Sequence, residues 1–453
     1  MIDALRLSFA TLLPWAAGFA LLRAALARSG NSNAWVEVGY GHFLGVLLLT
    51  LLLRAQDALG LRLGITFAAI VLSILTIAGV TLATRWRVRT PTPTTSVSSS
   101  YSPVLHWLAY AALLLIVLRV ATLAVDVVMR PLFAWDAWSQ WGTKAKVWSA
   151  LRDIVPFIGY DQWLARNVPG YTDTAPNYPA TIPLLQTWMT LALKRWDDAL
   201  MNLPWLMAFI ALGCGIYGQL RRLGVDRDWA VLATYLALSL PLLDTHVALA
   251  GYADLHVAAA YALGTLALVE WERSRQREAL FLLASVAILL PLLKLPGIAW
   301  LGTLMLGAFI AYFGTTPARI TAVAVAVLGV TIAAGLYLGS GKITPDAAET
   351  QYRVVESLVQ HLFAFGSWNL LWYLFPLALI VGWRSLAELK ATAMALGAGF
   401  AFLAWTFFFT QAGDWVVDYT TVNRALLHIA PAAATFAALL VSSALKRSSV
   451  PNQ

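Results

Sequence analysis

The sequence has little charge and almost no cysteine. Only 12% of its 453 residues are charged, whereas 60% are hydrophobic and the mean hydropathy is +0.72. Soluble proteins carry about 25% charged residues, so this composition excludes an ordinary soluble domain. The single cysteine, Cys214, excludes an intramolecular disulfide. No basic run interleaved with aromatic residues occurs outside the apolar segments, so the net charge of +8 does not indicate a nucleic-acid partner.

Long apolar runs recur from Leu5 to Leu445. A helix needs roughly 20 apolar residues to cross the hydrocarbon core of a bilayer. We therefore predict an all-α fold, a polytopic transmembrane helical bundle with about thirteen spans. The first run lacks a small-residue cleavage site and is interpreted as a retained span. The expected spans are residues 7–26, 36–53, 62–84, 104–128, 199–219, 229–244, 256–270, 279–293, 297–313, 319–338, 368–384, 391–409 and 426–445.

The basic residues gather in alternate loops. Sixteen of the 31 lie in short loops on one side of the expected spans, and by the positive-inside rule that side is cytoplasmic. The C-terminus is then inside, and an odd number of spans puts the N-terminus outside. We expect three leading helices at 1–84, a Thr/Pro/Ser-rich cytoplasmic linker at 85–103, a transmembrane core at 104–445 with outer loops at 129–198 and 339–367, and a cytoplasmic tail at 446–453.

The first outer loop opens with a dense group of tryptophan and polar residues at 133–148. At 100° per residue, Trp138, Trp141, Ala145 and Trp148 share one helical face, and Asp136, Ser139, Gln140 and Thr143 share the opposite one. This pattern predicts a helix in the membrane interface with its polar face toward a cavity, flanked by Lys144 and Lys146. An aromatic belt with an incidental acid is the alternative.

Farther along the same loop, residues 173–186 contain three prolines within eight residues. Proline prevents a continuous helix, so this stretch predicts a rigid extended turn before the next apolar run. The turn is either purely structural or a wall of a substrate groove.

Ionisable residues recur where the expected spans reach the outer face. Such residues are costly near a membrane and are usually functional. Within the fourth span, Arg119 and Asp126 are seven residues apart, and we expect them to form a structural ion pair. Together with Asp136, which follows the fourth span, the others come from at least four helical hairpins, which indicates one shared site. They are Asp244, His246, Asp254, Lys294, Arg424 and His428.

Several short motifs, in their order along the chain, resemble the polytopic bacterial glycosyltransferases of the GT-C type, relatives of the protein mannosyltransferases and of the aminoarabinose transferases of lipid A. The resemblance covers about residues 104–445 and leaves the three leading spans outside. The motifs are Trp135-Asp136-Ala137-Trp138, Lys144-Ala145-Lys146, Asn177-Tyr178-Pro179, Gly251-Tyr252-Ala253-Asp254, Lys294 with Gly297, and the stretch from Arg424 to Pro431.

The resemblance implies a catalytic acid in the first outer loop, which maps onto Asp136, and a polyprenyl-phosphate-linked sugar donor reached from the membrane. Many such enzymes have paired acids there, whereas Ala137 and Trp138 follow Asp136 here. Whether the site binds a divalent cation therefore stays an open question, and the ligands of such a cation are unknown. No other cofactor is expected.

Displacement of a lipid phosphate from a sugar carbon needs a base on the acceptor hydroxyl and cations at the departing phosphate. Asp136 is the predicted base, in an inverting displacement at the extracytoplasmic face of a bacterial inner membrane. The acceptor is a lipid, a glycan or a protein. The predicted phosphate-binding residues are Lys294, Arg424, His428, Lys144 and Lys146. The predicted sugar- or acceptor-binding residues are Trp135, Trp138, Gln140, Asn177, Tyr178, Tyr252 and Asp254.

Two other functions fit the same residues. A flippase or transporter for a lipid-linked sugar would use embedded charges along a translocation path and would have discontinuous helices. A glycan polymerase or ligase would use arginines of the outer loops, here Arg152, Arg166 and Arg353.

Overall fold

The computed structural model describes residues 2–30, 32–86, 103–166, 168–314, 348–410, 412–417, 419 and 421–448. Helices make up nearly all regular structure in these residues, which confirms the all-α prediction. Two short strands, β1 (Phe157–Ile158) and β2 (Tyr171–Thr172), pair in parallel within the first loop. Most of the predicted linker 85–103, the predicted span 319–338 and the end of the predicted tail lie outside the described residues.

Within each described range, the helices follow one another with short connections, apart from the longer segment between α4 and α8. Their bounds are α1 (Ile2–Ala27), α2 (Ala34–Ala58), α3 (Ile65–Arg85), α4 (Pro103–Met129), η1 (Ala137–Gly142), α5 (Thr143–Leu151), α6 (Tyr160–Leu164), α7 (Thr181–Leu193), η2 (Leu200–Asn202), α8 (Leu203–Arg222), α9 (Arg227–Leu238), α10 (Pro241–Ala248), α11 (Asp254–Ser274), α12 (Arg277–Ala287), α13 (Leu289–Leu293), α14 (Gly297–Phe313), α16 (Ala348–Val359), η3 (Gln360–Ala364), α17 (Leu371–Val381), α18 (Trp383–Glu388), α19 (Lys390–Phe409), α20 (Ala412–Val417), α21 (Val422–Leu427) and α22 (Ala430–Ser448).

Six helical segments of the described chain are long and apolar enough to cross a membrane. They are α1, α2, α3, α4, η2 with α8, and α19. The consecutive helices α9 and α10 are bent by 64° at a short break and make a seventh if they form one span. The other expected spans within the described residues coincide with shorter or more polar helices.

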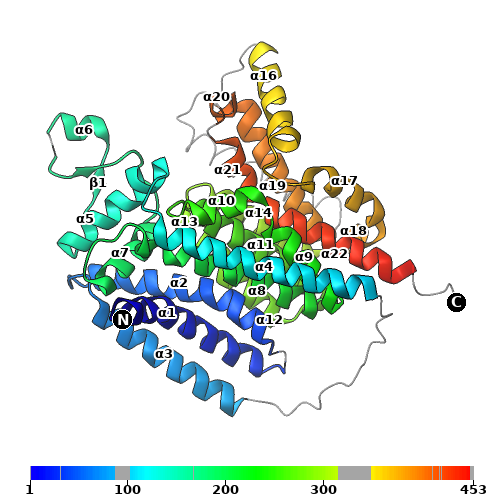
Figure 1. Cartoon of the computed structure of the whole chain (residues 1–453), viewed down its shortest axis with the longest axis horizontal. Helices are drawn as coiled ribbons and strands as arrows, with labels where there is room; N and C mark the ends of the chain where they lie inside the picture. Colours follow the sequence, from blue (N-terminus) through cyan, green and yellow to red (C-terminus); the bar gives the residue numbers. More distant parts are fainter. Residues whose placement is uncertain are drawn as a thin grey trace.

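The helix α11 lies at the centre of the bundle. Every residue from Asp254 to Trp271 is buried, and the helix contacts α8, α12, α14 and α22 (Figure 1). The run Ala258-Ala259-Ala260 keeps its surface narrow, which lets neighbouring helices approach closely. Because α11 begins at Asp254, a carboxylate stands at the start of the most enclosed helix.

In contrast, α3 and α4 present apolar side chains outward. Large exposed apolar surfaces are rare on soluble monomers, so these two faces are suited to contact with lipid. The exposed residues include Ile70, Ile74 and Ile77 of α3, and Leu113, Leu114, Val117, Leu118 and Val125 of α4.

The leading helices pack directly on the core through glycine. A Cβ atom at Gly45 of α2 would lie 2.1 Å from the carbonyl oxygen of Pro14 in α1. A Cβ at Gly39 would lie 2.3 Å from the Cα of Gly215 in α8. Van der Waals contact between closely spaced backbones is a main source of helix association in lipid. The three leading helices are therefore a packed layer of the bundle.

The expected pairing of Arg119 with Asp126 is wrong. Arg119 pairs with Asp244 of α10, and Asp126 pairs with Arg130 at 3.0 Å. Seven residues put two side chains on one helical face but separate them by about 10 Å along the axis. Arg130, one turn from Asp126, and Asp244 on the adjacent helix are nearer partners.

The two ends of the bundle differ in chemistry. Arg222 at the end of α8 pairs with Glu270 near the end of α11, and the guanidinium of Arg273 also reaches a backbone carbonyl of the α8–α9 turn. We call this the arginine-rich end. At the other end, α4 finishes and α11 begins, and we call it the site end.

The glycine contact between α1 and α2 makes a stability prediction. Gly45→Ala should lower the free energy of unfolding by about 1–3 kcal/mol, because the added methyl overlaps the Pro14 carbonyl. Gly302→Ala in α14 is the matched control, since its methyl enters open space and alanine favours helix by about 1 kcal/mol. Thermal unfolding of the full chain in detergent measures both. Equal stability of the two variants would contradict the packing.

Candidate active site

Asp136 lies between the end of α4 and the π-helix η1, at the site end of the bundle. Its side chain is 19% exposed. Single π-helical turns occur frequently at functional sites because they shift side chains away from the α-helical register. Here the turn places Asp136 beside residues from three distant parts of the chain.

The π-helical turn also corrects the expected arrangement of the tryptophans. Trp141 and Trp148 are buried in the core, whereas Trp138 is exposed and contacts the exposed ring of Trp135 at a centroid distance of 4.9 Å. The prediction that Trp138, Trp141 and Trp148 share one face is therefore wrong. Ser139, predicted on the polar face, is buried. The assumed rotation of 100° per residue does not hold here, because a π-helical turn contains more than the 3.6 residues of an α-helical turn.

The structure brings five predicted residues into one hydrogen-bonded network. Arg424 Nη1 lies 2.6 Å from Asp136 Oδ2, and Arg424 Nη2 and Nε donate to Asp254 Oδ2 at 3.0 and 3.2 Å. Asp254 Oδ1 accepts from Lys294 Nζ at 2.7 Å and from His428 Nε2 at 2.8 Å. Asp254 thus accepts four hydrogen bonds, from Lys294, His428 and Arg424, and Asp136 joins the network through Arg424.

Trp300 defines the protonation of His428. The indole Nε1 of Trp300 donates to His428 Nδ1 at 3.0 Å, and an indole N–H can only donate. Nδ1 therefore carries no proton, and His428 Nε2 carries the one that it donates to Asp254. His428 is neutral and both of its nitrogens are engaged. This corrects its predicted role, because it holds Asp254 and has no N–H left for a phosphate.

The formal charges of the network sum to zero, and its side chains differ in how deeply they are buried. Two carboxylates face two cations, and His428 is neutral. The Asp254 side chain is fully buried, the Lys294 side chain is 10% exposed, and those of Arg424 and Asp136 are 21% and 19% exposed. The predicted contact of Asp254 with a sugar is thus wrong, because its oxygens are already occupied inside the protein. Lys294 likewise supports Asp254 from behind, and only Asp136 and Arg424 lie at the rim.

The tight turn between α10 and α11 holds these side chains in place. Gly251, with a φ of 113°, lets the α10–α11 turn approach η1, since a Cβ there would lie 2.6 Å from the Ala137 Cβ. Trp205 Nε1 donates to the Tyr252 carbonyl at 2.7 Å, and the Tyr252 ring lies 4.3 Å from the Arg424 guanidinium carbon. The cation–π contact fixes the plane of the guanidinium.

Tyr178 is a second aromatic residue beside the network. Its ring meets Trp141 edge to face at 5.3 Å. Burial raises the pKa of Tyr178 to about 12, and the negative charge of Asp254 adds to this effect. Tyr178 is therefore a neutral hydroxyl at neutral pH. The preceding Asn177 is exposed, and Gln140 of η1 is half-buried.

The proline-rich stretch is an irregular turn up to Ala180 and then helical. Pro183 lies in the first turn of α7, where its missing N–H costs no intrahelical hydrogen bond. The expected turn is thus shorter than residues 173–186.

Lys144 is not at the network. It is buried and pairs with Asp173 at 2.8 Å, and its Nζ also donates to the Ala175 carbonyl at 2.7 Å. Burial lowers the pKa of Lys144, and Asp173 acts in the opposite direction. The predicted phosphate contact of Lys144 is wrong, because this cation ties α5 to the proline-rich stretch. Lys146 is exposed and lies over the Trp196 ring at 5.6 Å, in a separate pocket.

The donor set at the network does not fit a divalent cation. Arg424 already bridges Asp136 and Asp254, and Asp254 has no oxygen left for a metal. Nor does any group of three or more His, Cys, Asp or Glu side chains with the spacing of metal ligands occur elsewhere in the described ranges.

Sequence reasoning did not identify Trp300 and Asp173 as site residues. Trp300 is one of 20 tryptophans and lies inside an apolar helix, so its sequence gives no sign that it orients a histidine. Asp173 is 29 positions from Lys144, and only the fold brings the two together.

No protein-family model, curated protein or solved structure matches the chain.

Because Asp254 is buried more deeply than Asp136, substitution of the two acids should lower the free energy of unfolding by different amounts. Asp254→Asn should lower the free energy of unfolding by about 3–5 kcal/mol, because it leaves Lys294 and Arg424 buried without their partner. Asp136→Asn leaves Arg424 paired with Asp254, so it should cost less, about 1–2 kcal/mol for one charge-assisted hydrogen bond. Thermal unfolding in detergent, followed by tryptophan fluorescence, measures both. A similar loss in both variants would contradict the assignment of Asp254 as the buried centre of the network.

Proposed function

We propose that this chain is a membrane glycosyltransferase of the GT-C type, which moves a sugar from a polyprenyl-phosphate donor to an acceptor hydroxyl. The observation that carries the proposal is the 2.6 Å ion pair between Asp136 and Arg424 at the rim of a buried network. It joins a carboxylate that can accept a proton to a guanidinium whose fork fits phosphate.

The proposed reaction is one in-line displacement. The acceptor oxygen attacks the anomeric carbon while the bond from that carbon to the phosphate oxygen breaks. The hydroxyl proton passes to Asp136, and the polyprenyl phosphate leaves with the bonding electrons. The sugar configuration inverts. A positioned base contributes about 10² to 10⁴ in rate.

Arg424 couples donor binding to the base. Asp254 fixes the Nε and Nη2 edge of the guanidinium, so that Nη1 faces Asp136. A donor phosphate at Nη1 competes with Asp136 for this cation. The phosphate therefore displaces Asp136 from Arg424 and leaves its carboxylate free to accept the hydroxyl proton.

The exposed pair Trp135 and Trp138 lies next to Asp136 and offers ring surfaces to the apolar face of a sugar. Tyr252 lies over the Arg424 guanidinium, and Tyr178 is close to the network. With Gln140 and Asn177, these two residues are proposed to donate or accept hydrogen bonds with sugar or acceptor hydroxyl groups. These contacts orient the anomeric carbon toward the base.

The distribution of charge supports the membrane placement. The arginine-rich end carries the loops that the positive-inside rule assigns to the cytoplasm. The site end then faces the extracytoplasmic side of a bacterial inner membrane, in a bundle of about thirteen spans. Polyprenyl donors and lipid, glycan or protein acceptors are accessible there.

A lipid-linked-sugar flippase is the second candidate. The 64° break between α9 and α10 is the discontinuous helix that a transporter uses, and α10 carries Asp244 and His246. Proteoliposomes containing a labelled undecaprenyl-phosphate hexose separate the two functions. Movement of the lipid across the bilayer without covalent transfer would support the flippase and overturn the transferase.

The proposed base is tested by Asp136→Asn. Transfer from radiolabelled undecaprenyl-phosphate hexoses should fall by about 10² to 10⁴, because the amide cannot accept the hydroxyl proton. Asp126→Asn is the matched control, since it removes a carboxylate from a surface pair with Arg130. Donor binding should be unchanged in the control and equal or tighter in Asp136→Asn, because the amide no longer competes with the phosphate for Arg424. Turnover by Asp136→Asn close to that of the control would remove Asp136 from this role.

The phosphate role of Arg424 is tested by Arg424→Lys. Lysine keeps a positive charge near Asp254 but loses the planar fork, so donor affinity should fall about tenfold or more. Arg130→Lys is the control at an exposed pair of the same end. Titration of the full chain with the labelled donor measures the change. Unchanged affinity in Arg424→Lys would contradict phosphate binding at this guanidinium.

A further inference from the structure

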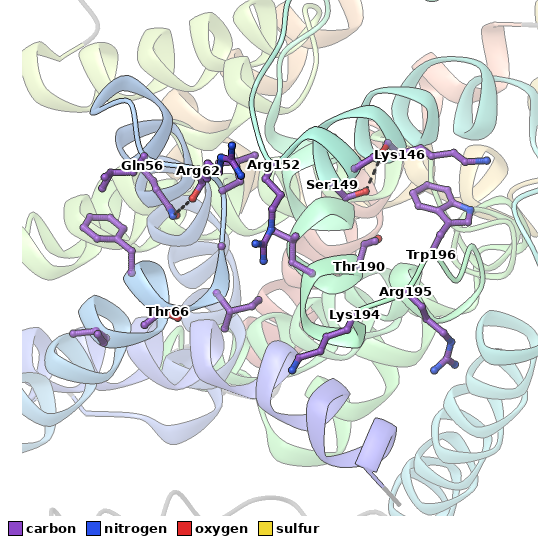
Figure 2. A pocket seen from close by; sticks show the side chains of 18 residues that line it. Gln56, Arg62, Thr66, Lys146, Ser149, Arg152, Thr190, Lys194, Arg195 and Trp196 are labelled. Atoms are coloured by element: carbon purple, nitrogen blue, oxygen red, sulfur yellow. Dashed lines mark hydrogen bonds between the residues drawn. The ribbon is translucent and has the colours of Figure 1, made fainter.

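A second concave site lies at the site end, away from the network. Its cavity has a volume of about 1130 Å³ and lies between the α2–α3 turn, the end of α5 and the end of α7 (Figure 2). None of the five network residues lines it. The leading helices, which fall outside the resemblance to glycosyltransferases, supply one wall.

The cavity is strongly cationic. Five basic side chains line it, and none of the described residues that line it is acidic. Arg195 is already paired with Asp3 and Asp197 outside the lining. Within the described part of the chain, Arg62, Arg152 and Lys194 form no ion pair, and Lys146 lies over Trp196. Like charges that line one cavity repel one another, so the cavity is suited to an anion.

The backbone places two of these cations at helix ends. Arg152 ends α5 and Lys194 ends α7, both in the left-handed region, with φ of 57° and 61°. A cation at a helix C-terminus is favourable by itself, so helix capping explains each residue separately. Capping does not explain why two such ends and the turn bearing Arg62 converge on one cavity. The Leu63 amide, which donates to the Arg152 carbonyl at 2.7 Å, joins the two walls.

Part of the lining is apolar and comes from the α2–α3 turn and the first two turns of α3. Leu61, Phe67 and Ile70 line the cavity. From Ile70 the exposed side chains Ile74 and Ile77 follow at spacings of four and three residues, along one face of a candidate membrane span. A hydrocarbon chain along this face would start at the cavity.

We infer that this cavity binds the phosphate headgroup of a membrane lipid, whose hydrocarbon chain lies along α3. Arginine and lysine form charge-assisted hydrogen bonds with phosphate oxygens, and arginine binds them with two parallel bonds. The apolar face favours a lipid phosphate over free phosphate. This inference does not depend on the proposed transfer reaction.

The test uses the full chain in detergent, titrated with dioctanoyl phosphatidic acid. The variant is the double substitution Arg152→Gly and Lys194→Gly. Glycine adopts the left-handed conformation without steric cost, so both charges disappear while the backbone stays favourable. Affinity for phosphatidic acid should fall at least tenfold, because two charge-assisted contacts are lost. Arg62→Gln, on the exposed turn, should weaken binding in the same direction.

The matched control is Arg275→Gly. Arg275 also ends a helix in the left-handed region, with a φ of 57°, but lies at the arginine-rich end. The affinity of the Arg275→Gly variant for phosphatidic acid should equal that of the unaltered chain. Dioctanoyl phosphatidylcholine and inorganic phosphate, tested in parallel, should bind at least tenfold more weakly than phosphatidic acid.

Three results would overturn the inference. The first is equal binding of phosphatidic acid to the double-glycine variant and the control. The second is inorganic phosphate binding as tightly as phosphatidic acid, which would indicate a site for a free anion. The third is no measurable binding of phosphatidic acid to the unaltered chain. Failure of sugar transfer would leave this measurement unaffected, so the two proposals are tested separately.

Discussion

The buried carboxylate of Asp254 is the interaction on which the site end of this protein depends. Removing a charge from water costs several kcal/mol, and it is tolerated only when partners and hydrogen bonds surround the charge. Asp254 meets this requirement with Arg424, Lys294 and a neutral His428. These partners come from two other segments of the chain, the α13–α14 turn and the segment of α21 that leads into α22, so the carboxylate holds both in fixed relation to α11. Trp300 extends the network one step farther by fixing the histidine proton.

In this arrangement the buried residues of the network differ in role from the two residues at its rim. The deep residues satisfy one another, whereas Asp136 and Arg424 lie at the rim with part of each side chain exposed. An ion pair at the rim can exchange its partner for a ligand at low cost, because solvent already screens part of its attraction. A fully buried pair cannot, since the remaining charge would lose its only partner. The same five residues can therefore provide both a rigid buried network and, at its rim, an ion pair that can exchange one partner for a ligand.

The site end carries two places suited to negatively charged groups, and they differ in how their cations are balanced. In the network, two carboxylates neutralise two cations before any ligand arrives. In the cavity beside α3, most cations lack such partners within the described residues. The balanced site suits a group that arrives, reacts and leaves, and the unbalanced one suits a group that stays bound. The leading helices contribute only to the second, although Gly39 and Gly45 pack them firmly on the core.

The sequence by itself determined the all-α class and many of the apolar helices, because hydrophobic runs of helical length suffice to mark them: the predicted span 297–313 coincides with α14, Gly297–Phe313. It did not mark α7, Thr181–Leu193, which lies in a segment predicted as a loop. It also indicated that Asp136, Asp254, Lys294 and Arg424 converge, since each lies at the same end of its expected span. Only the tertiary structure decided which partner each charge has. Arg119 pairs with Asp244 and Lys144 with Asp173, because the nearest opposite charge lies on another segment, and spacing along one helix carries no information about its neighbours. The exposure of Trp138 was likewise decided by a π-helical turn, which the residue pattern of an ideal helix does not reveal.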